Sequence, residues 1–289
     1  MTRVVREVSV LTHSRPAQIA PALDRLIAAA RAAGVVLRFD CDEAVKLGLK
    51  TAGVIVCDSE PEPSGEVQLC VVLGGDGTIL KGLRGYARTD VPVFAVNFGE
   101  VGFLATIDPG GLDEYGFERA FGFDFEQVRL PAISIRTPSG GLLTAINDIS
   151  FQRVVGGRVA QLAYGVEGEE AGSVRCDGLV VCTAAGSPGY NLANGGPVMA
   201  WGVEGFGVSF IAPHSLTARA LIVAPDDALS VSNRGREAVD VSVDGRPTCQ
   251  IAPGEELVAH YEPSAALLAQ LPGWSFYRRL RTKFGRLAS

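Results

Sequence analysis

The sequence has few of the residues that build metal centres, disulfides or membrane spans. Its 289 residues include only three histidines and six cysteines. The cysteines are scattered and form no C-x-x-C pair, which favours buried, reduced thiols over a metal site or a disulfide framework. No apolar run approaches the roughly 18 residues of a membrane-spanning helix. The apolar 47% of the chain is therefore expected to form a core.

The chain also lacks a signal-like start and a basic excess. Charged residues interrupt its first apolar stretch, and no small-residue cleavage site follows, so we expect a cytoplasmic protein with no membrane partner. The formal net charge of −6 excludes a generally basic protein that binds nucleic acid polymers. Any phosphate site must therefore be built locally, from backbone amides and a few basic side chains.

Glycine, in contrast, is abundant, with 35 residues or about 12% of the chain, against roughly 7% in average proteins. Short apolar runs bounded by turn residues are typical of strands buried in a parallel sheet, and helical periodicity lies between them. This alternation predicts a doubly wound α/β domain. The expected strands are residues 4–11, 35–39, 53–57, 67–73 and 91–96, and the expected helices are 16–33 and 78–88.

After residue 121 the pattern changes to short β-rich segments separated by Gly, Pro, Asp and Asn, which predicts an antiparallel β domain. The segment 276–286 has an amphipathic helical pattern. We therefore expect an α/β domain of residues 1–121, joined by a C-terminal helix within 270–289, and a β-rich, substrate-binding domain of residues 122–269.

The densest motif is Gly74-Gly75-Asp76-Gly77-Thr78, which directly follows a predicted buried strand and precedes a helix. Glycines let backbone amides approach an anion closely, and the helix N-terminus favours negative charge, so the loop suits phosphate. A carboxylate beside phosphate is useful when it binds a metal ion or takes a proton from an attacking hydroxyl. A tight turn capped by Asp76 is the structural alternative, and the spacing fits neither a P-loop nor a dinucleotide fingerprint.

Two further clusters carry polar residues at expected strand ends or inside a strand. The segment that begins Asn97-Phe98-Gly99 follows the next strand, where open α/β sheets collect ligands. The pair Asn147-Asp148 interrupts an apolar stretch, and both side chains can reach one side only if a strand end or bulge intervenes. A carboxylate there can accept both hydroxyls of a ribose. A plain loop or turn explains either cluster equally well.

A fourth cluster spans residues 176–197 and contains a small-residue turn after an apolar strand. Ser187 is expected to cap a short helix with Pro188 at its first position, whereas Asp177 and Tyr190 have no such structural explanation. Further on, His214 and Arg219 lie near a turn, where they could contact phosphate or simply form a surface loop.

Together, these clusters resemble the NAD kinase family. The family patterns G-G-D-G-T, N-x-G-x-x-G-F-L, N-[ED] and D-G…T-x-x-G-S-x-x-Y…G-G-P match residues 74–78, 97–104, 147–148 and 177–197 in order and spacing. The resemblance continues into residues 213–216 and the C-terminal helix, and so covers most of the chain. It implies an N-terminal α/β domain, a C-terminal β-rich domain, and transfer of the ATP γ-phosphoryl group, or of polyphosphate, to the 2′-hydroxyl of the adenosine of NAD with Mg²⁺ or another divalent cation.

The resemblance also implies residue roles. Asp76 would activate the acceptor hydroxyl, Asn147 and Asp148 would bind the acceptor's adenosine, and Asp177 would bind the nicotinamide carboxamide. The residues expected to hold donor phosphates are Gly74, Gly75, Gly77 and Thr78. The residues expected to line the acceptor site are Asn97, Phe98, Asn147, Asp148, Asp177, Thr183, Ala185, Ser187, Pro188, Gly189 and Tyr190.

The chain departs from the family pattern in the acceptor segment. Where the family has T-P-[TS]-G-S-T-A-Y, this chain has Ala184, Ala185, Pro188 and Gly189 in place of the usual residues. A lost pair of polar contacts is worth roughly 1–3 kcal/mol. The acceptor is therefore NAD or, in a diverged relative, another nucleoside or nucleotide, and a non-catalytic nucleotide sensor is the alternative of another class. Nucleotide substrates and a homodimer or homotetramer are the expected partners.

Overall fold

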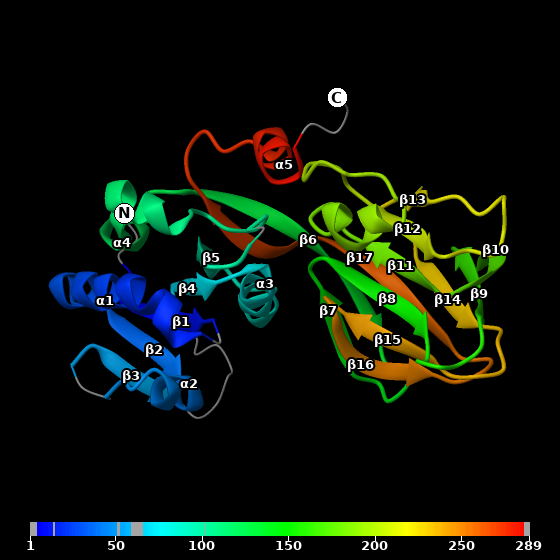
Figure 1. Cartoon of the computed structure of the whole chain (residues 1–289), viewed down its shortest axis with the longest axis horizontal. Helices are drawn as coiled ribbons and strands as arrows, with labels where there is room; N and C mark the ends of the chain where they lie inside the picture. The colour runs from blue at the N-terminus through cyan, green and yellow to red at the C-terminus, as the bar shows by residue number, and fades with distance from the viewer. Residues whose placement is uncertain (1–4, 14, 51–52, 59–65, 101, 286–289) are drawn as a thin grey trace. The chain divides into compact units, whose positions relative to one another are not determined.

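The computed structural model describes residues 5–13, 15–50, 53–58, 66–100 and 102–285. The chain divides into two compact units, one of residues 1–129 and 266–289 and one of residues 130–265 (Figure 1). The first residue of the predicted strand 4–11, Val101 of the second motif, and the last residue of the predicted helix 276–286 lie outside the described residues.

The first unit contains a parallel sheet in the order β17-β5-β4-β1-β2-β3. Two adjacent strands, β4 and β5, are buried at every position, as their unbroken apolar runs predict. In register, Gly74 at the end of β4 pairs with Asn97 at the end of β5. The strand bounds are β1 Glu7–Thr12, β2 Val36–Asp40, β3 Ile55–Asp58, β4 Leu69–Gly74, β5 Pro92–Asn97 and β17 Glu256–Gln270.

Helices cover both faces of this sheet. Helices α1 and α4 share one core with alternate residues of β4, among them Val71 and Leu73. The intervening residue Val72 lies against Gly82 of α3 on the other face. This arrangement confirms the predicted doubly wound unit. The helix bounds are α1 Pro16–Ala33, α2 Cys41–Lys46, α3 Asp76–Gly85, the 3-10 turn η1 Pro109–Gly111, α4 Leu112–Phe121 and α5 Phe276–Phe284.

The second unit is β-rich, as predicted. One antiparallel sheet has the order β13-β12-β11-β8-β15-β16, and β10, β9, β14 and the first part of β17 pair in that order. Inward-facing aliphatic and aromatic side chains such as Phe151 and Phe206 form its core. The bounds are β6 Glu126–Arg136, β7 Leu142–Ala145, β8 Asp148–Arg153, β9 Ala160–Val166, β10 Glu169–Cys176, β11 Gly178–Cys182, β12 Phe206–Ile211, β13 Leu221–Val223, β14 Leu229–Asn233, β15 Val239–Val243 and β16 Arg246–Ile251.

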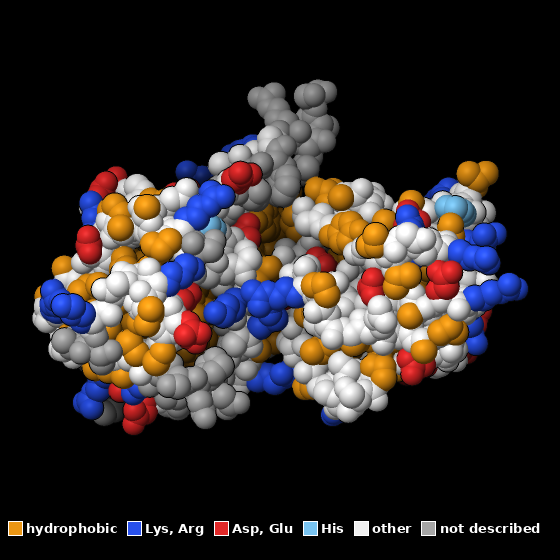
Figure 2. Space-filling view, turned by 60° about the horizontal axis from the view of Figure 1, so that its bottom comes forward, with side chains coloured by type: hydrophobic (Ala, Val, Ile, Leu, Met, Phe, Trp, Pro, Cys, Tyr) orange, Lys and Arg blue, Asp and Glu red, His pale blue; other side chains and the backbone are white. Residues whose placement is uncertain are grey.

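Basic and acidic side chains are interspersed with apolar ones on the face that Figure 2 shows. Among the described residues, no helix is long and apolar enough to cross a membrane. No disulfide joins the six cysteines, all of which lie among the described residues, and burial raises the pKa of Cys176 to about 11 and that of Cys182 to about 12. These thiols therefore stay protonated near neutral pH.

Candidate active site

The glycine-rich motif forms the turn between β4 and α3, at the carboxyl ends of the adjacent strands β4 and β5. Its backbone lies directly against the segment after β5, because the Phe98 amide donates to the Gly74 carbonyl over 3.0 Å. A Cβ atom at Gly75 would lie 3.1 Å from the Gly99 Cα atom, and one at Gly99 would lie 2.8 Å from the Gly75 Cα atom. Only glycine at both positions permits this approach. The structure thus brings the first two sequence motifs together.

Asp76 is the first residue of α3, and its carboxylate faces the segment after β5. The two carboxylate oxygens accept the Phe103 and Leu104 amides, each over 3.0 Å. Gly75, and not Asp76, occupies the N-cap, and no side chain bonds there. Asp76 is half-buried. Because each carboxylate oxygen has two lone pairs, each retains one for a further donor.

Asn97 organises the same segment from the end of β5. Its side-chain oxygen accepts the Gly99 amide over 2.9 Å, and its side-chain nitrogen donates to Asp108 over 3.0 Å. The Asn97 side chain is thus bonded within the first unit, and partly buried Phe98 packs against the unit's core.

Arg279 on α5 holds the other edge of the segment after β5. The sequence motifs did not identify this residue. Its guanidinium donates to the carbonyls of Phe103, over 2.8 Å, and of Ala105, and to the Gln270 side-chain oxygen over 2.9 Å. Burial lowers the pKa of Arg279 to about 10. Asp76 thus binds amides, and Arg279 binds carbonyls, of the same short stretch, residues 103–105. The only signal in the sequence was an arginine on an amphipathic helix.

Replacing Arg279 with methionine should loosen this stretch. The buried carbonyls and Gln270 would lose their charged donor, and we expect the free energy of unfolding to fall by roughly 2–3 kcal/mol. Urea denaturation measures this loss. The matched control is Arg278→Met on the same helix, because Arg278 is exposed. Equal midpoints for the two variants would contradict the clamping role.

Asn147 and Asp148 lie at a strand end in the second unit. The apolar stretch that holds the pair forms two strands, β7 and β8, and Asp148 is the first residue of β8. This break lets adjacent side chains escape the strict alternation of a strand. Asn147 Oδ1 is buried and has no hydrogen-bond partner among the described residues. A buried unpaired acceptor is uncommon in proteins, and it can accept a donor from a ligand.

Asp244 supports this pair from the turn between β15 and β16. Its carboxylate accepts the amides of Ile146, Asn147 and Asp148 over 3.2, 2.7 and 3.2 Å. Its own amide donates to the Asp148 carbonyl over 2.9 Å. Burial, and then the nearby charge of Asp244, raise the pKa of the Asp148 carboxyl to about 7. Asp244 therefore fixes the backbone of Asn147 and Asp148, and the ionised form of the Asp148 carboxyl is energetically costly.

The small-residue turn after β11 is tied to the same pair. Thr183 is fully buried, and its hydroxyl donates to the Ile146 carbonyl over 2.6 Å. A Cβ atom at Gly186 would lie 2.1 Å from the Asn147 carbonyl oxygen, so only glycine fits there. Ala185 is also buried. The third and fourth motifs thus meet within the second unit.

Ser187 does not cap the following turn, and this prediction was wrong. Its buried hydroxyl donates to the Ala184 carbonyl and accepts the Met199 amide over 2.9 and 2.8 Å. The turn is a single π-helical turn, η2 Ser187–Asn191, with Gly186 at its N-cap and Pro188 at its second rather than first position. The Ser187 hydroxyl bonds to the Met199 amide instead of a helix amide, because the segment that contains Met199 lies next to this turn.

Tyr190 and Asp177 lie in the same unit and are more accessible. Tyr190 is 36% exposed. Burial, and then the charges of Asp148 and Asp177, raise the pKa of its phenol. Asp177 accepts a hydrogen bond from Arg153 Nε over 2.6 Å in an ion pair that sequence analysis did not predict. Gly189 is exposed and Pro188 is buried.

His214 and Arg219 are exposed in the segment after β12. The His214 amide donates to the Arg175 carbonyl over 2.7 Å. Arg219 Nη1 donates to the carbonyls of Leu216 and Ala218, both over 2.8 Å, so that side chain stabilises its own loop. The structure joins neither residue to the motifs described above.

Comparison with known proteins matches two domain families along the chain. The ATP-NAD kinase N-terminal domain matches residues 50–115, and the ATP-NAD kinase C-terminal domain matches residues 146–267. The NAD kinase of Lachnoclostridium phytofermentans is 32% identical over an alignment of 231 residues, and the match covers 76% of this chain and 81% of the relative. The NAD kinase 2 of Streptomyces coelicolor is 30% identical over 286 residues, 97% of this chain and 94% of the relative.

Solved structures share the fold. Yeast NADH kinase complexed with NADH has a TM-score of 0.87 at 22% identity, over 99% of this chain and 89% of that one. An NAD kinase from Archaeoglobus fulgidus in complex with ATP has a TM-score of 0.72 at 24% identity, over 96% and 97%. At such identities the likeness is one of fold.

The fold and the glycine-rich loop with its aspartate define a phosphotransferase that acts on an alcohol group of its acceptor. The chain belongs to the NAD kinase family. This membership confirms the resemblance found in the motifs, the predicted fold class and the predicted ATP-dependent phosphorylation of NAD to NADP.

Proposed function

We propose that Asp76 is the general base of this NAD kinase and that the loop of Gly74, Gly75, Gly77 and Thr78 holds the donor phosphates. The position of this loop supports the proposal most, because backbone amides at the N-terminus of α3 follow the carboxyl end of a buried strand. The remaining lone pairs of Asp76 are free to accept the proton of the acceptor hydroxyl. The ribose oxygen then bonds to the γ-phosphorus as the bond to the β-phosphate oxygen breaks, and ADP leaves.

The acceptor side of the proposal depends on the second unit. Asn147 Oδ1 supports it most, as a buried acceptor that awaits a donor. The Asp148 carboxylate would accept ribose hydroxyls, and Asp177 and Tyr190 would line the site. Thr183, Ala185 and Ser187 would shape it through the backbone, since the two hydroxyls are already bonded within the protein. In this scheme the domain predicted from the sequence at residues 122–269 would bind the acceptor, and the domain predicted at residues 1–121 with the helix within 270–289 would carry the donor loop.

A divalent cation fits this scheme as part of the bound nucleotide. Among the described residues, no cluster of three or more His, Cys, Asp or Glu side chains is arranged to hold a metal. Mg²⁺ is commonly bound by one or two carboxylates together with substrate phosphates, so such a cluster is not needed. The cation would neutralise charge on the donor phosphates. We also propose a cytoplasmic homodimer or homotetramer, which the resemblance to the family supports.

The activity is tested by incubating the full chain with γ-labelled ATP, Mg²⁺ and a panel of NAD, NADH and free nucleosides. We expect label in NADP, identified by its ability to support an NADP-dependent dehydrogenase. Polyphosphate in place of ATP tests the alternative donor. Label in a free nucleoside and none in NAD or NADH would overturn the assignment of the acceptor, and retained nucleotide binding without any transfer would overturn that of a kinase.

A further inference from the structure

An arginine-lined cavity of about 740 Å³ lies in the second unit, and of its lining residues only Asp177 has a role in the proposed reaction. Five arginines line it together with one aspartate and one glutamate, so the lining carries a formal excess of three positive charges. The whole chain has a net charge of −6, so this excess does not follow from its composition. The lining arginines are Arg153, Arg158, Arg175, Arg234 and Arg236.

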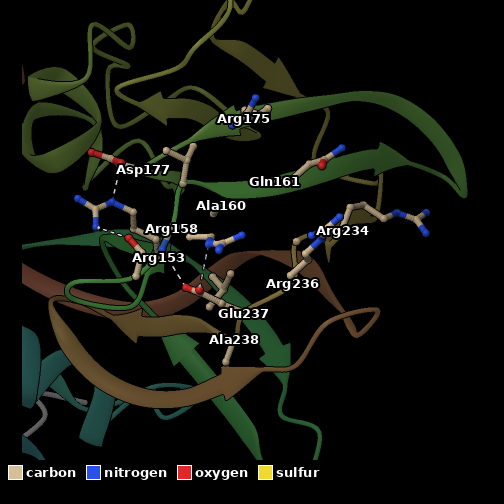
Figure 3. A pocket seen from close by; sticks show the side chains of 14 residues that line it. Arg153, Arg158, Ala160, Gln161, Arg175, Asp177, Arg234, Arg236, Glu237 and Ala238 are labelled. Atoms are coloured by element: carbon tan, nitrogen blue, oxygen red, sulfur yellow. Dashed lines mark hydrogen bonds and ion pairs between the residues drawn. The ribbon is translucent and has the colours of Figure 1, made fainter.

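These arginines come from segments far apart in the sequence. Arg153 ends β8, Arg158 follows in the loop to β9, Arg175 lies on β10, and Arg234 and Arg236 lie in the loop from β14 to β15. Figure 3 shows Arg153 with Asp177 on one side of the depression and Arg234 with Arg236 on the other. A concave surface lined by one sign of charge concentrates the electric field and attracts counter-ions.

The loop that carries Arg234 and Arg236 is fixed by hydrogen bonds. Asn233 is fully buried, and its side chain donates to the Glu237 carbonyl and accepts the Gly235 amide over 2.8 and 2.9 Å. Glu237 in turn accepts the Arg158 amide over 2.8 Å, which joins the two arginine-bearing loops. The cavity is therefore held in shape before any ligand binds, which lowers the entropy cost of binding.

The acidic neighbours neutralise these arginines weakly. The Arg158–Glu237 pair spans 3.9 Å and the Arg234–Glu170 pair 3.4 Å, and all four side chains are more than 40% exposed. Exposed pairs of this kind contribute little and are easily exchanged. Arg236 makes no side-chain hydrogen bond or ion pair with any described residue. Its planar guanidinium can bind two oxygens of one phosphate.

We propose that this cavity binds a small molecule that carries a diphosphate group, through arginines that have no part in the acceptor site, although the cavity shares Asp177 with that site. A terminal phosphate carries about 1.5–2 negative charges near neutral pH, and the second phosphate of a diphosphate adds about one more, which together match the excess of the lining. The contacts are assigned to Arg158, Arg234 and Arg236, since Arg153 is engaged by Asp177 over 2.6 Å. The volume lies within the roughly 300–1,000 Å³ of sites that enclose whole small ligands, so the diphosphate can carry a nucleoside.

The test measures binding of inorganic pyrophosphate, and separately of ADP, by calorimetry with and without NAD at saturation. The variant is Arg158→Gln with Arg236→Gln, and we expect its affinity for the probe at this site to fall at least tenfold. The matched control is Arg136→Gln with Arg246→Gln, two exposed arginines of the same unit outside the cavity, and its affinity should change less than twofold. Tighter binding of ADP than of pyrophosphate identifies a nucleoside-borne diphosphate, and the reverse identifies the free anion.

Two outcomes would overturn the proposal. If the cavity variant binds both probes as tightly as the wild type, the cavity is not their site. If saturating NAD removes all the binding that the variant loses, the cavity belongs to the acceptor site and is not separate. Kinase activity of the variant is measured in parallel. If its kcat and KM for NAD are unchanged, a failure of the cavity proposal leaves the proposed function intact.

Discussion

Replacing Asp76 with asparagine should lower kcat by about 10²- to 10⁴-fold, the range over which general bases contribute. An amide cannot accept the proton of the acceptor hydroxyl, whereas the glycine loop that would hold ATP is unchanged. The dissociation constant of ATP, measured by calorimetry, is therefore expected to stay within a few-fold of the wild-type value. Activity is measured as transfer of labelled phosphate to NAD.

The structural role of Asp76 demands a control for this experiment. Its two oxygens accept the amides of Phe103 and Leu104, and asparagine can accept only one of them well. Arg279→Met loosens the same stretch from its carbonyl side without removing the carboxylate. If the loss in Asp76→Asn came from a displaced segment, Arg279→Met would lose as much activity. Comparable losses, or near-full activity in Asp76→Asn, would contradict the assignment of the base.

The sequence contained most of what is needed to predict the first unit. Unbroken apolar runs that end in glycine or asparagine gave β4 and β5, and glycine at positions 75 and 99 was the visible sign of two backbones in contact. Neighbouring parallel strands end at the same edge of a sheet, so two motifs at such ends are expected to meet. These features are local, and local patterns are readable from sequence.

The side chains that hold the site in place could not be predicted from such local patterns. Arg279 reaches carbonyls 174 and 176 residues away, and Asp244 reaches amides 96 to 98 residues away. The dipeptide Asp244-Gly245 is a common hairpin-turn signal, which explains its position but not the three amides that its carboxylate accepts. Likewise, Ser187 fits a capping pattern, yet the Met199 amide took its hydroxyl. Side-chain bonds between distant segments depend on the completed fold.

Stability should depend on pH through Asp148. The Asp148 carboxyl is 8% exposed, and burial followed by repulsion from Asp244 raises its pKa to about 7. An unfolded aspartate has a pKa of roughly 3.9. A carboxyl whose pKa is raised by folding stabilises the protein below the unfolded pKa, and this contribution is lost as the pH rises through the folded pKa. The wild type should thus lose on the order of 3–4 kcal/mol between pH 4 and 8.

The variant Asp148→Asn isolates this contribution, because asparagine stays neutral at every pH. In urea denaturation at pH 5, 6, 7 and 8, its stability relative to the wild type is expected to rise up to about pH 7 and to level off above it, because the Asp148 carboxyl is then ionised in both states. The control is Asp226→Asn, an exposed aspartate of the same unit, whose difference from the wild type should stay nearly constant. Parallel pH profiles for Asp148→Asn and the wild type would show that Asp148 is ionised in the folded protein throughout.

The same titration bears on acceptor binding. Near neutral pH the Asp148 carboxyl is divided between its two forms, and only the ionised form accepts both hydroxyls of a ribose. The other titratable groups close to it are Asp244, Cys182 and Tyr190, and burial raises the pKa values of the thiol and the phenol, so both stay neutral here. The KM for NAD should therefore fall as the pH rises through about 7, while the dissociation constant of ATP stays level. The ionised Asp148 carboxylate thus lowers the free energy of unfolding at the pH where NAD binds best. Such a residue serves ligand binding rather than folding.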